Sequence, residues 1–248
     1  MKKSRKVKTV MIILLVIIIC GFSFFGYMFM NGLSGIRINP QYKEDQIKVA
    51  LVGDSVTYGH SIRNWPKNNY PALLSDLLGE KYCVKSYGVS GSTVQPDGDQ
   101  PYNITKAYTW SHDFDCDILV FMLGSNDSKP ENWKGAEAFK REYLKLLNSY
   151  LNTEEPPLVL MCTPPTAYFP EGKTTGLTNY DIQPLIVEEI ADIIREAATE
   201  SGYTLIDINN LTENRRELFG KDNVHPNNDG AKAIAECIYK FIPKYSGD

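Results

Sequence analysis

The stretch from Ile47 to Gly59 reads IKVALVGDSVTYG and decides the fold. Its first part, residues 47–52, is a short apolar run typical of a buried strand. Gly53 then ends the strand, and Ser55 follows on the turn into the next element. In open α/β sheets this carboxyl edge is where ligands bind, and a serine on such a turn is placed to act as a nucleophile. An ordinary turn would explain the same Gly-Asp-Ser tripeptide, so the choice between a turn and a nucleophile depends on the rest of the sequence.

Short apolar runs alternate with longer amphipathic segments from residue 47 onward. The pattern predicts strands at 47–53, 82–87, 117–123, 157–162 and 203–208. It predicts helices at about 69–79, 134–151, 181–201 and 227–242. Strands separated by helices indicate a three-layer α/β/α fold with a five-stranded, flavodoxin-like parallel sheet and helices on both faces.

The composition limits the possible partners. The chain has 248 residues, 43% of them hydrophobic, and a net charge of -4. That size fits one domain of about 200 residues plus additions. No basic stripe follows the first few residues, which argues against nucleic acid as a partner. The five cysteines show no C-x-x-C spacing, which favours buried free thiols over a disulfide framework or a zinc site.

The N-terminus predicts a membrane anchor. Basic residues within 1–9 precede an uncharged apolar run at 10–30, long enough to span about 30 Å of hydrocarbon. The basic side should remain in the cytoplasm, which puts a stalk at 31–46 and a catalytic domain at 47–248 outside the cell, and we expect that cell to be bacterial. The alternative is a secreted protein whose signal peptide is cleaved near Gly32-Leu33-Ser34.

Two long connections stand out at residues 93–113 and 163–180. Connections of this length in a compact domain are usually functional or disordered. Both follow predicted strands, on the side of the sheet that carries Ser55, and both are rich in aromatic residues. We expect them to form the rim of a site.

A serine nucleophile needs a base, and the chain has three histidines. His60 is only five positions after Ser55, too near to reach back from the same helix, and His112 is in an aspartate-rich segment. His225 has Asp222 three residues before it, where a carboxylate can fix the tautomer of the ring. Alternatively, Asp222 caps a turn and His225 is a surface residue.

Acyl transfer also needs donors for a developing oxyanion. The segment 87–93 is rich in glycine, so its backbone N–H groups can approach a ligand closely. Asn126 follows the third predicted strand with an amide side chain. The alternatives are an ordinary glycine turn and a helix cap, respectively.

The order of these pieces resembles the SGNH (GDSL-type) hydrolase family, which has four sequence blocks. They read GDSVTYG at 53–59, GVSGST at 88–93, GSND at 124–127 and DNVHP at 222–226. The resemblance covers about residues 47–242. It implies a serine esterase with Ser55 as nucleophile, His225 as general base and Asp222 orienting that base.

The same resemblance implies an oxyanion hole made by the N–H of Ser55, the N–H of Gly91 and the side chain of Asn126. Asp54 is expected to be a structural turn residue, and Asp127 a local hydrogen-bond acceptor. The resemblance implies no cofactor and gives no support to a metal site.

Residues 124–133 are similar to the branch of the family that contains sialate and other carbohydrate O-acetylesterases. We therefore expect an acylated glycan or another small ester as substrate, with Tyr58, Trp110 and Tyr168 among aromatic residues at the rim. These aromatic side chains alternatively only pack the loops. An O-acyltransferase, a lysophospholipase or thioesterase, and a non-catalytic glycan-binding module remain open, and the oligomeric state is not predicted.

Overall fold

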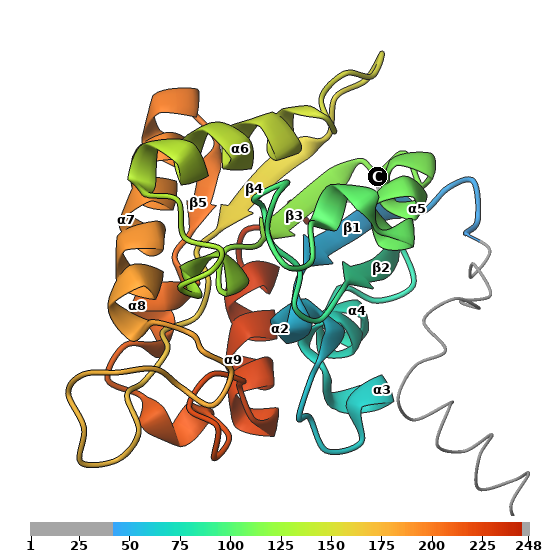
Figure 1. The fold of residues 1–248 in the computed structure, drawn as a ribbon. Coiled ribbons are helices and arrows are strands. Elements are labelled where there is room, and N and C mark those ends of the chain that lie inside the picture. The colour runs from blue at the N-terminus through green and yellow to red at the C-terminus, as the bar shows by residue number, and fades with distance from the viewer. Residues whose placement is uncertain (1–41, 245–248) are drawn as a thin grey trace, which may run out of the picture. The chain divides into compact units, whose positions relative to one another are not determined.

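The computed structural model describes residues 42–244, which are organised around one five-stranded parallel sheet (Figure 1). The strands are β1 (Ile47–Gly53), β2 (Tyr82–Gly88), β3 (Ile118–Met122), β4 (Leu158–Cys162) and β5 (Thr204–Ile206). Their order in the sheet is β2-β1-β3-β4-β5. The chain therefore moves outward from β1 in one direction and then in the other, which leaves a switch point at the carboxyl ends of β1 and β3.

The central strands are buried on both faces, which is why they read as continuous apolar runs. All residues of β3 are buried, and so are residues 49–53 of β1. Gly53 pairs with Gly88 on one side and with Met122 on the other. The three strands therefore end level with one another, and the segments that follow them meet at one edge.

Helices cover both faces of the sheet. On one face α6 (Ala136–Asn148) and α7 (Pro184–Ser201) pack with residues such as Phe139 and Ile190. On the other, α4 (Tyr70–Leu78) and α9 (Asn228–Tyr239) pack with residues such as Leu74 and Ile234. The three-layer α/β/α architecture and the five-strand parallel sheet are as predicted (Figure 1).

The first long connection differs from the prediction, because it contains α5 (Lys106–Asp113). Thr105 caps this helix by accepting a hydrogen bond from the N–H of Tyr108 at 3.1 Å. Tyr108 and Trp110 pack against the core on the α6 and α7 face. The second connection has neither helix nor strand between β4 and α7, in agreement with the prediction.

The remaining helical segments are short and lie at the ends of strands or in connections. They are α2 (Ser55–Tyr58), α3 (Trp65–Asn68), α8 (Ile208–Thr212) and the 3-10 turns η1 (Tyr102–Ile104), η2 (Asn126–Ser128) and η3 (Arg216–Leu218).

The predicted anchor at 10–30 and most of the predicted stalk lie outside the described residues. Within residues 42–244, every helix is too short or too polar to cross a membrane. The membrane anchor and the location of the domain outside the cell therefore stay predictions.

Candidate active site

Ser55 lies on the tight turn between β1 and α2. Asp54 caps this one-turn helix, because its Oδ1 accepts a hydrogen bond from the N–H of Val56 at 2.9 Å. Gly53 is required here, since a Cβ at that position would lie 2.1 Å from Thr57 Oγ1 and 2.7 Å from Met122 O. Burial raises the pKa of Asp54, against the hydrogen bond from Val56, and Asp54 serves as the structural turn residue expected.

His225 comes from the other end of the domain to meet Ser55. Its Nε2 lies 2.9 Å from Ser55 Oγ, and its Nδ1 lies 2.9 Å from Asp222 Oδ2. The other Asp222 oxygen accepts the backbone N–H groups of Val224 and His225 at 3.0 and 2.9 Å. With the Nδ1 proton directed at the carboxylate, Nε2 is left to accept the Ser55 hydroxyl. The structure thus brings together the three residues predicted to act as nucleophile, base and orienting acid.

Asp222 is held as a carboxylate. Burial alone would raise its pKa, but the hydrogen bonds from the His225 ring and from the backbone N–H groups of His225 and Val224 lower it well below the usual range. A permanent negative charge at this position would stabilise an imidazolium at His225.

The three predicted oxyanion donors belong to Ser55, Gly91 and Asn126, and all three residues line one cavity. Gly91 adopts a φ of 84°, a left-handed conformation that suits glycine. Asn126 Nδ2 donates to Ser92 O at 3.1 Å, which leaves its second amide proton for a ligand. Among residues 42–244, no acceptor pairs with the backbone N–H of Ser55 or of Gly91.

Asp127 ties the glycine-rich segment to the end of β3. Its carboxyl group is fully buried and accepts the N–H of Val94 at 3.0 Å and that of Gln95 at 2.9 Å. These donors lie 33 and 32 positions away, so the expectation of a local acceptor was wrong. Burial, helped by the nearby Asp54, raises the pKa of Asp127 to about 7. Asp127 therefore positions the loop that carries Gly91.

The cavity beside Ser55 has a volume of about 310 Å³. Its lining includes Ser55, Gly91, Asn126 and His225, together with residues that the sequence analysis did not assign: His60, Ser90, Ser125, Lys129, Asn179, Tyr180, Asp181, Ile182 and Val224. Most of these side chains are polar, and the two aliphatic ones are Ile182 and Val224.

His60 lies beside the proposed base, contrary to the expectation that it shares a helix with Ser55. The helix α2 already ends at Tyr58, because Gly59 has a φ of 88° and turns the chain away. The His60 ring then lies 4.4 Å from the His225 ring, and its Nε2 lies 3.2 Å from Tyr180 Oη. Burial and the proximity of His225 lower the pKa of His60, which favours the neutral ring.

The three aromatic residues predicted to bind substrate do not line this cavity. Tyr58 stacks on Trp65 with ring centres 5.3 Å apart, and Trp110 packs against the core. Tyr168 packs edge-on against Phe219 and donates its hydroxyl to Thr212 O at 2.5 Å. For these side chains the structure shows the alternative role, which is to pack the loops.

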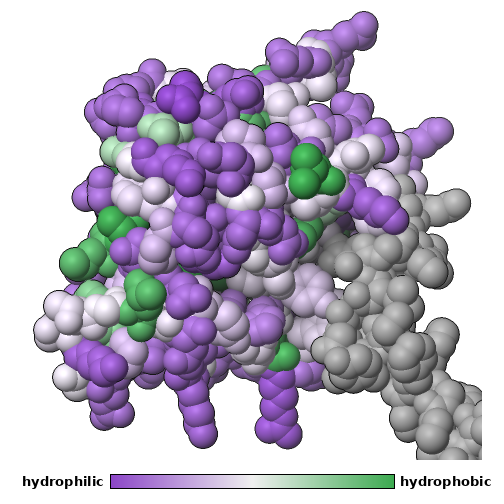
Figure 2. Space-filling model, in the orientation of Figure 1, coloured by the Kyte–Doolittle hydropathy of each residue, from purple (hydrophilic) through white to green (hydrophobic). Residues whose placement is uncertain are grey.

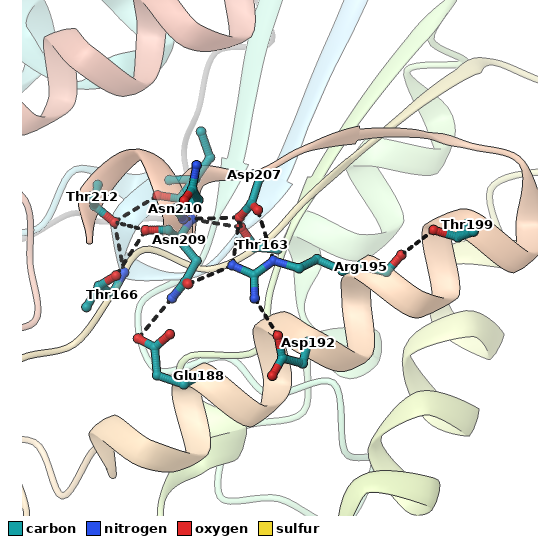
Figure 3. A network of polar contacts seen from close by, with 11 residues as sticks. Thr163, Thr166, Glu188, Asp192, Arg195, Thr199, Asp207, Asn209, Asn210 and Thr212 are labelled. Carbon is teal, nitrogen blue, oxygen red and sulfur yellow. Dashed lines mark hydrogen bonds and ion pairs between the residues drawn. The ribbon is translucent and has the colours of Figure 1, made fainter. Parts of the chain in front are cut away.

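A polar network holds the start of the second long connection (Figure 3). Arg195 of α7 binds both oxygens of Asp207 at 2.9 and 3.0 Å and Asn209 Oδ1 at 2.8 Å. Thr163, the first residue after β4, donates to Asp207 and accepts the N–H of Asn209 at 2.8 Å. Thr166 is tied to α8 through the Asn209 carbonyl at 3.0 Å. The connection therefore leaves the sheet from a rigid base.

Residues 42–244 contain no group of three or more His, Cys, Asp or Glu side chains arranged to hold a metal ion. The carboxylates near Ser55 are instead engaged with backbone N–H groups and with His225.

The sequence of this chain is similar to that of known proteins. Residues 51–233 match the model of the GDSL-like Lipase/Acylhydrolase family. An "Acetylxylan esterase" from Xylanibacter ruminicola is 34% identical over 220 residues, which cover 82% of this chain but 44% of that protein. The chain thus spans less than half the length of this curated relative.

Solved structures share the fold. A carbohydrate acetylesterase family member from Sinorhizobium meliloti is 23% identical, with a TM-score of 0.66, over 79% of this chain and 97% of that one. An aryl esterase of M. smegmatis is 18% identical, with a TM-score of 0.64, over 79% and 97%. The predicted family is confirmed by the family match: the chain belongs to the GDSL-like lipase/acylhydrolase family.

Proposed function

We propose that this protein is a serine esterase that removes acetyl or other short acyl groups from hydroxyls of a carbohydrate. The observation that carries the proposal is the continuous chain of hydrogen bonds from Asp222 through His225 to Ser55, which ends in a cavity lined by the oxyanion donors. This is the constellation that acyl transfer through a serine requires.

The reaction follows from this geometry in two halves. Ser55 Oγ attacks the ester carbonyl carbon while its proton passes to His225 Nε2, and the carbonyl oxygen takes up the negative charge beside the N–H groups of Ser55 and Gly91 and the amide of Asn126. The intermediate collapses, the imidazolium returns its proton to the leaving sugar oxygen, and Ser55 is acylated. Water then attacks the acyl group with the same proton transfers, which releases the acid and restores the Ser55 hydroxyl.

Two features favour a short acyl group on a polar alcohol. Among the residues that line the cavity, only Ile182 and Val224 have aliphatic side chains, and most of the others have polar side chains. The face seen in Figure 2 is largely hydrophilic, and its apolar residues lie scattered rather than in one broad patch. A lipid acyl hydrolase would be expected to offer a long aliphatic surface instead. The relative named as an acetylxylan esterase points the same way.

The first experiment compares Ser55→Ala with the wild type on a series of nitrophenyl esters from acetate to octanoate. We expect the wild type to prefer acetate and Ser55→Ala to lose on the order of 10³-fold or more in kcat/KM. The matched control is Ser75→Ala on α4, remote from the cavity, which should behave as wild type.

Labelling adds an independent readout, because a fluorophosphonate should modify Ser55 in the wild type and in Ser75→Ala but not in Ser55→Ala. Full activity of Ser55→Ala would show that this assignment is wrong. A preference for octanoate over acetate would favour the lipid acyl hydrolase.

A further inference from the structure

The second long connection ends in a turn, Thr178–Ile182, at the mouth of the cavity. Its middle residues Asn179, Tyr180 and Asp181 are exposed, and all three line the cavity with Ser55. The flanking residues Thr178 and Ile182 are buried. The turn thus offers polar side chains to the cavity from a base packed into the protein.

Hydrogen bonds within the turn make it rigid. The N–H of Thr178 donates to Ile182 O at 3.0 Å, and the N–H of Asp181 donates to Thr178 O at 3.2 Å. The Thr178 hydroxyl also accepts the N–H groups of Tyr180 and Ile182 at 3.3 and 3.2 Å. Asp181 is held at a φ of 58°, a left-handed conformation that Asp and Asn adopt more readily than other residues with a Cβ.

The turn is also fixed relative to the reacting groups. Tyr180 Oη lies 3.2 Å from His60 Nε2, and the Tyr180 ring packs edge-on against the His225 ring with centres 5.0 Å apart. The next residue, Gln183, donates its side-chain amide to Ser128 O at 2.7 Å, at the end of the short helix η2 that begins with Asn126. The turn is therefore tied both to the proposed base and to the oxyanion side of the site.

The chemistry of the turn suits a sugar rather than an acyl chain. An aromatic ring can pack on the C–H face of a pyranose, and amide and carboxylate oxygens accept hydrogen bonds from hydroxyls. A carboxylate beside a methyl group would instead lose hydration without gaining a partner. The apolar lining at Ile182 and Val224 is better suited to that methyl group.

We propose that the turn Thr178–Ile182 is the subsite that binds the sugar carrying the acyl ester, with Tyr180 as its platform and Asn179 and Asp181 as its hydrogen-bonding groups. This subsite rests on the proposed esterase function. Because the turn is built before substrate arrives, little order has to be gained on binding.

The test uses Asn179→Ala and Asp181→Gly in the full chain. Glycine adopts the positive φ of position 181 without strain, so the turn is kept while the carboxylate is removed. We expect the ratio of kcat/KM for partially acetylated xylo-oligosaccharides to kcat/KM for nitrophenyl acetate to fall by about tenfold in each variant, mainly through KM. The matched control is Thr175→Ala, exposed in the same connection but outside the cavity lining, which should leave the ratio unchanged.

Three results would overturn the subsite while leaving the esterase in place. The ratio could be unaffected in both variants. The variants could change the preference between nitrophenyl acetate and butyrate, which would put the turn on the acyl side. The wild type could cleave nitrophenyl acetate through Ser55 but no acetylated sugar, which would leave an esterase but also remove the carbohydrate from the proposed function. Loss of the Ser55 dependence itself would instead remove the proposed function.

Discussion

Two carboxyl groups of the site, Asp222 and Asp127, have pKa values that are shifted in opposite directions. Asp222 is kept ionised, because the hydrogen bonds from His225 and from backbone N–H groups outweigh its burial and lower its pKa. Asp127 is more deeply buried and lies near Asp54, which raises its pKa to about 7. Two acids of the same type thus suit different tasks, one to stabilise a cation and one to hold a loop.

The role of Asp222 can be tested through the tautomer of His225, the proposed base. In Asp222→Asn the amide group can face His225 Nδ1 with a donor, which would move the ring proton to Nε2 and leave Ser55 without an acceptor. We expect kcat on nitrophenyl acetate to fall on the order of 10⁴-fold. The matched variant is Asp229→Asn in the first turn of α9, which should keep wild-type activity and show that the loss is specific. Wild-type kcat in Asp222→Asn would remove Asp222 from the mechanism.

The site residues that belong to one of the four sequence blocks could be predicted from the sequence. The site residues outside those blocks could not. Ser55, Gly91, Asn126 and His225 each follow a strand or precede a helix in a recognisable motif. His60 and Tyr180 come to the site only because two turns direct them there. The signal for His60 was Gly59, which can end a helix after one turn. The sequence contains no comparable signal for the turn Thr178–Ile182, which brings Tyr180 to the cavity.

Among the elements, the connection between β4 and α7 depends on Arg195, whose guanidinium binds both oxygens of Asp207 and reaches Asn209 (Figure 3). Lysine cannot reproduce this forked geometry. We expect Arg195→Lys to lower the free energy of unfolding by about 1–2 kcal/mol and the Tm by roughly 2–6 °C. The effect is modest because both side chains of the pair are partly exposed.

The control for this element is Arg141→Lys, since Arg141 pairs with Glu142 on the surface of α6 and its side chain is 64% exposed. Its Tm should match that of the wild type in a thermal melt followed by circular dichroism. Equal melting temperatures for Arg195→Lys and the wild type would mean that the connection is held by its other contacts.

The strands and long helices were predictable because burial leaves a strong pattern. Central parallel strands must be apolar on both faces, and the helices that cover them must be apolar on one. The helix α5 was missed because its sequence, KAYTWSHD, is rich in residues of modest helix propensity. Its stability comes from packing of Trp110 and Tyr108 against the core, which a local pattern does not reveal.

At the scale of the domain formed by residues 42–244, carboxyl groups whose pKa is shifted in opposite directions have opposite effects on how stability depends on pH. Asp99, Asp207 and Asp222 have lowered pKa values, through hydrogen bonds and nearby cations that outweigh burial. They contribute stability above the unfolded pKa, and this is lost as the pH falls. Asp127 has the opposite effect on the pH dependence of stability, because burial raises its pKa from 3.8 to about 7.

Asp127 therefore allows a prediction about the stability of the whole domain. Between about pH 4 and pH 7 the folded chain keeps a proton on Asp127 that the unfolded chain has lost, so this group stabilises the fold at low pH and loses its contribution as the pH rises. In Asp127→Asn the uncharged side chain mimics the protonated form at every pH. We expect the free energy of unfolding of the wild type to fall relative to Asp127→Asn across this window, by at most about 1.4 kcal/mol per pH unit.

Urea denaturation at half-unit steps from pH 4 to pH 8 measures this difference directly, because contributions common to both proteins cancel. Asp97→Asn, an exposed aspartate in the same loop as Val94 and Gln95, is the control and should follow the wild type at every pH. If wild-type stability instead rose relative to Asp127→Asn with increasing pH, Asp127 would be ionised in the fold. The N–H groups of Val94 and Gln95 would then outweigh burial at that carboxylate, as the hydrogen bonds at Asp222 do.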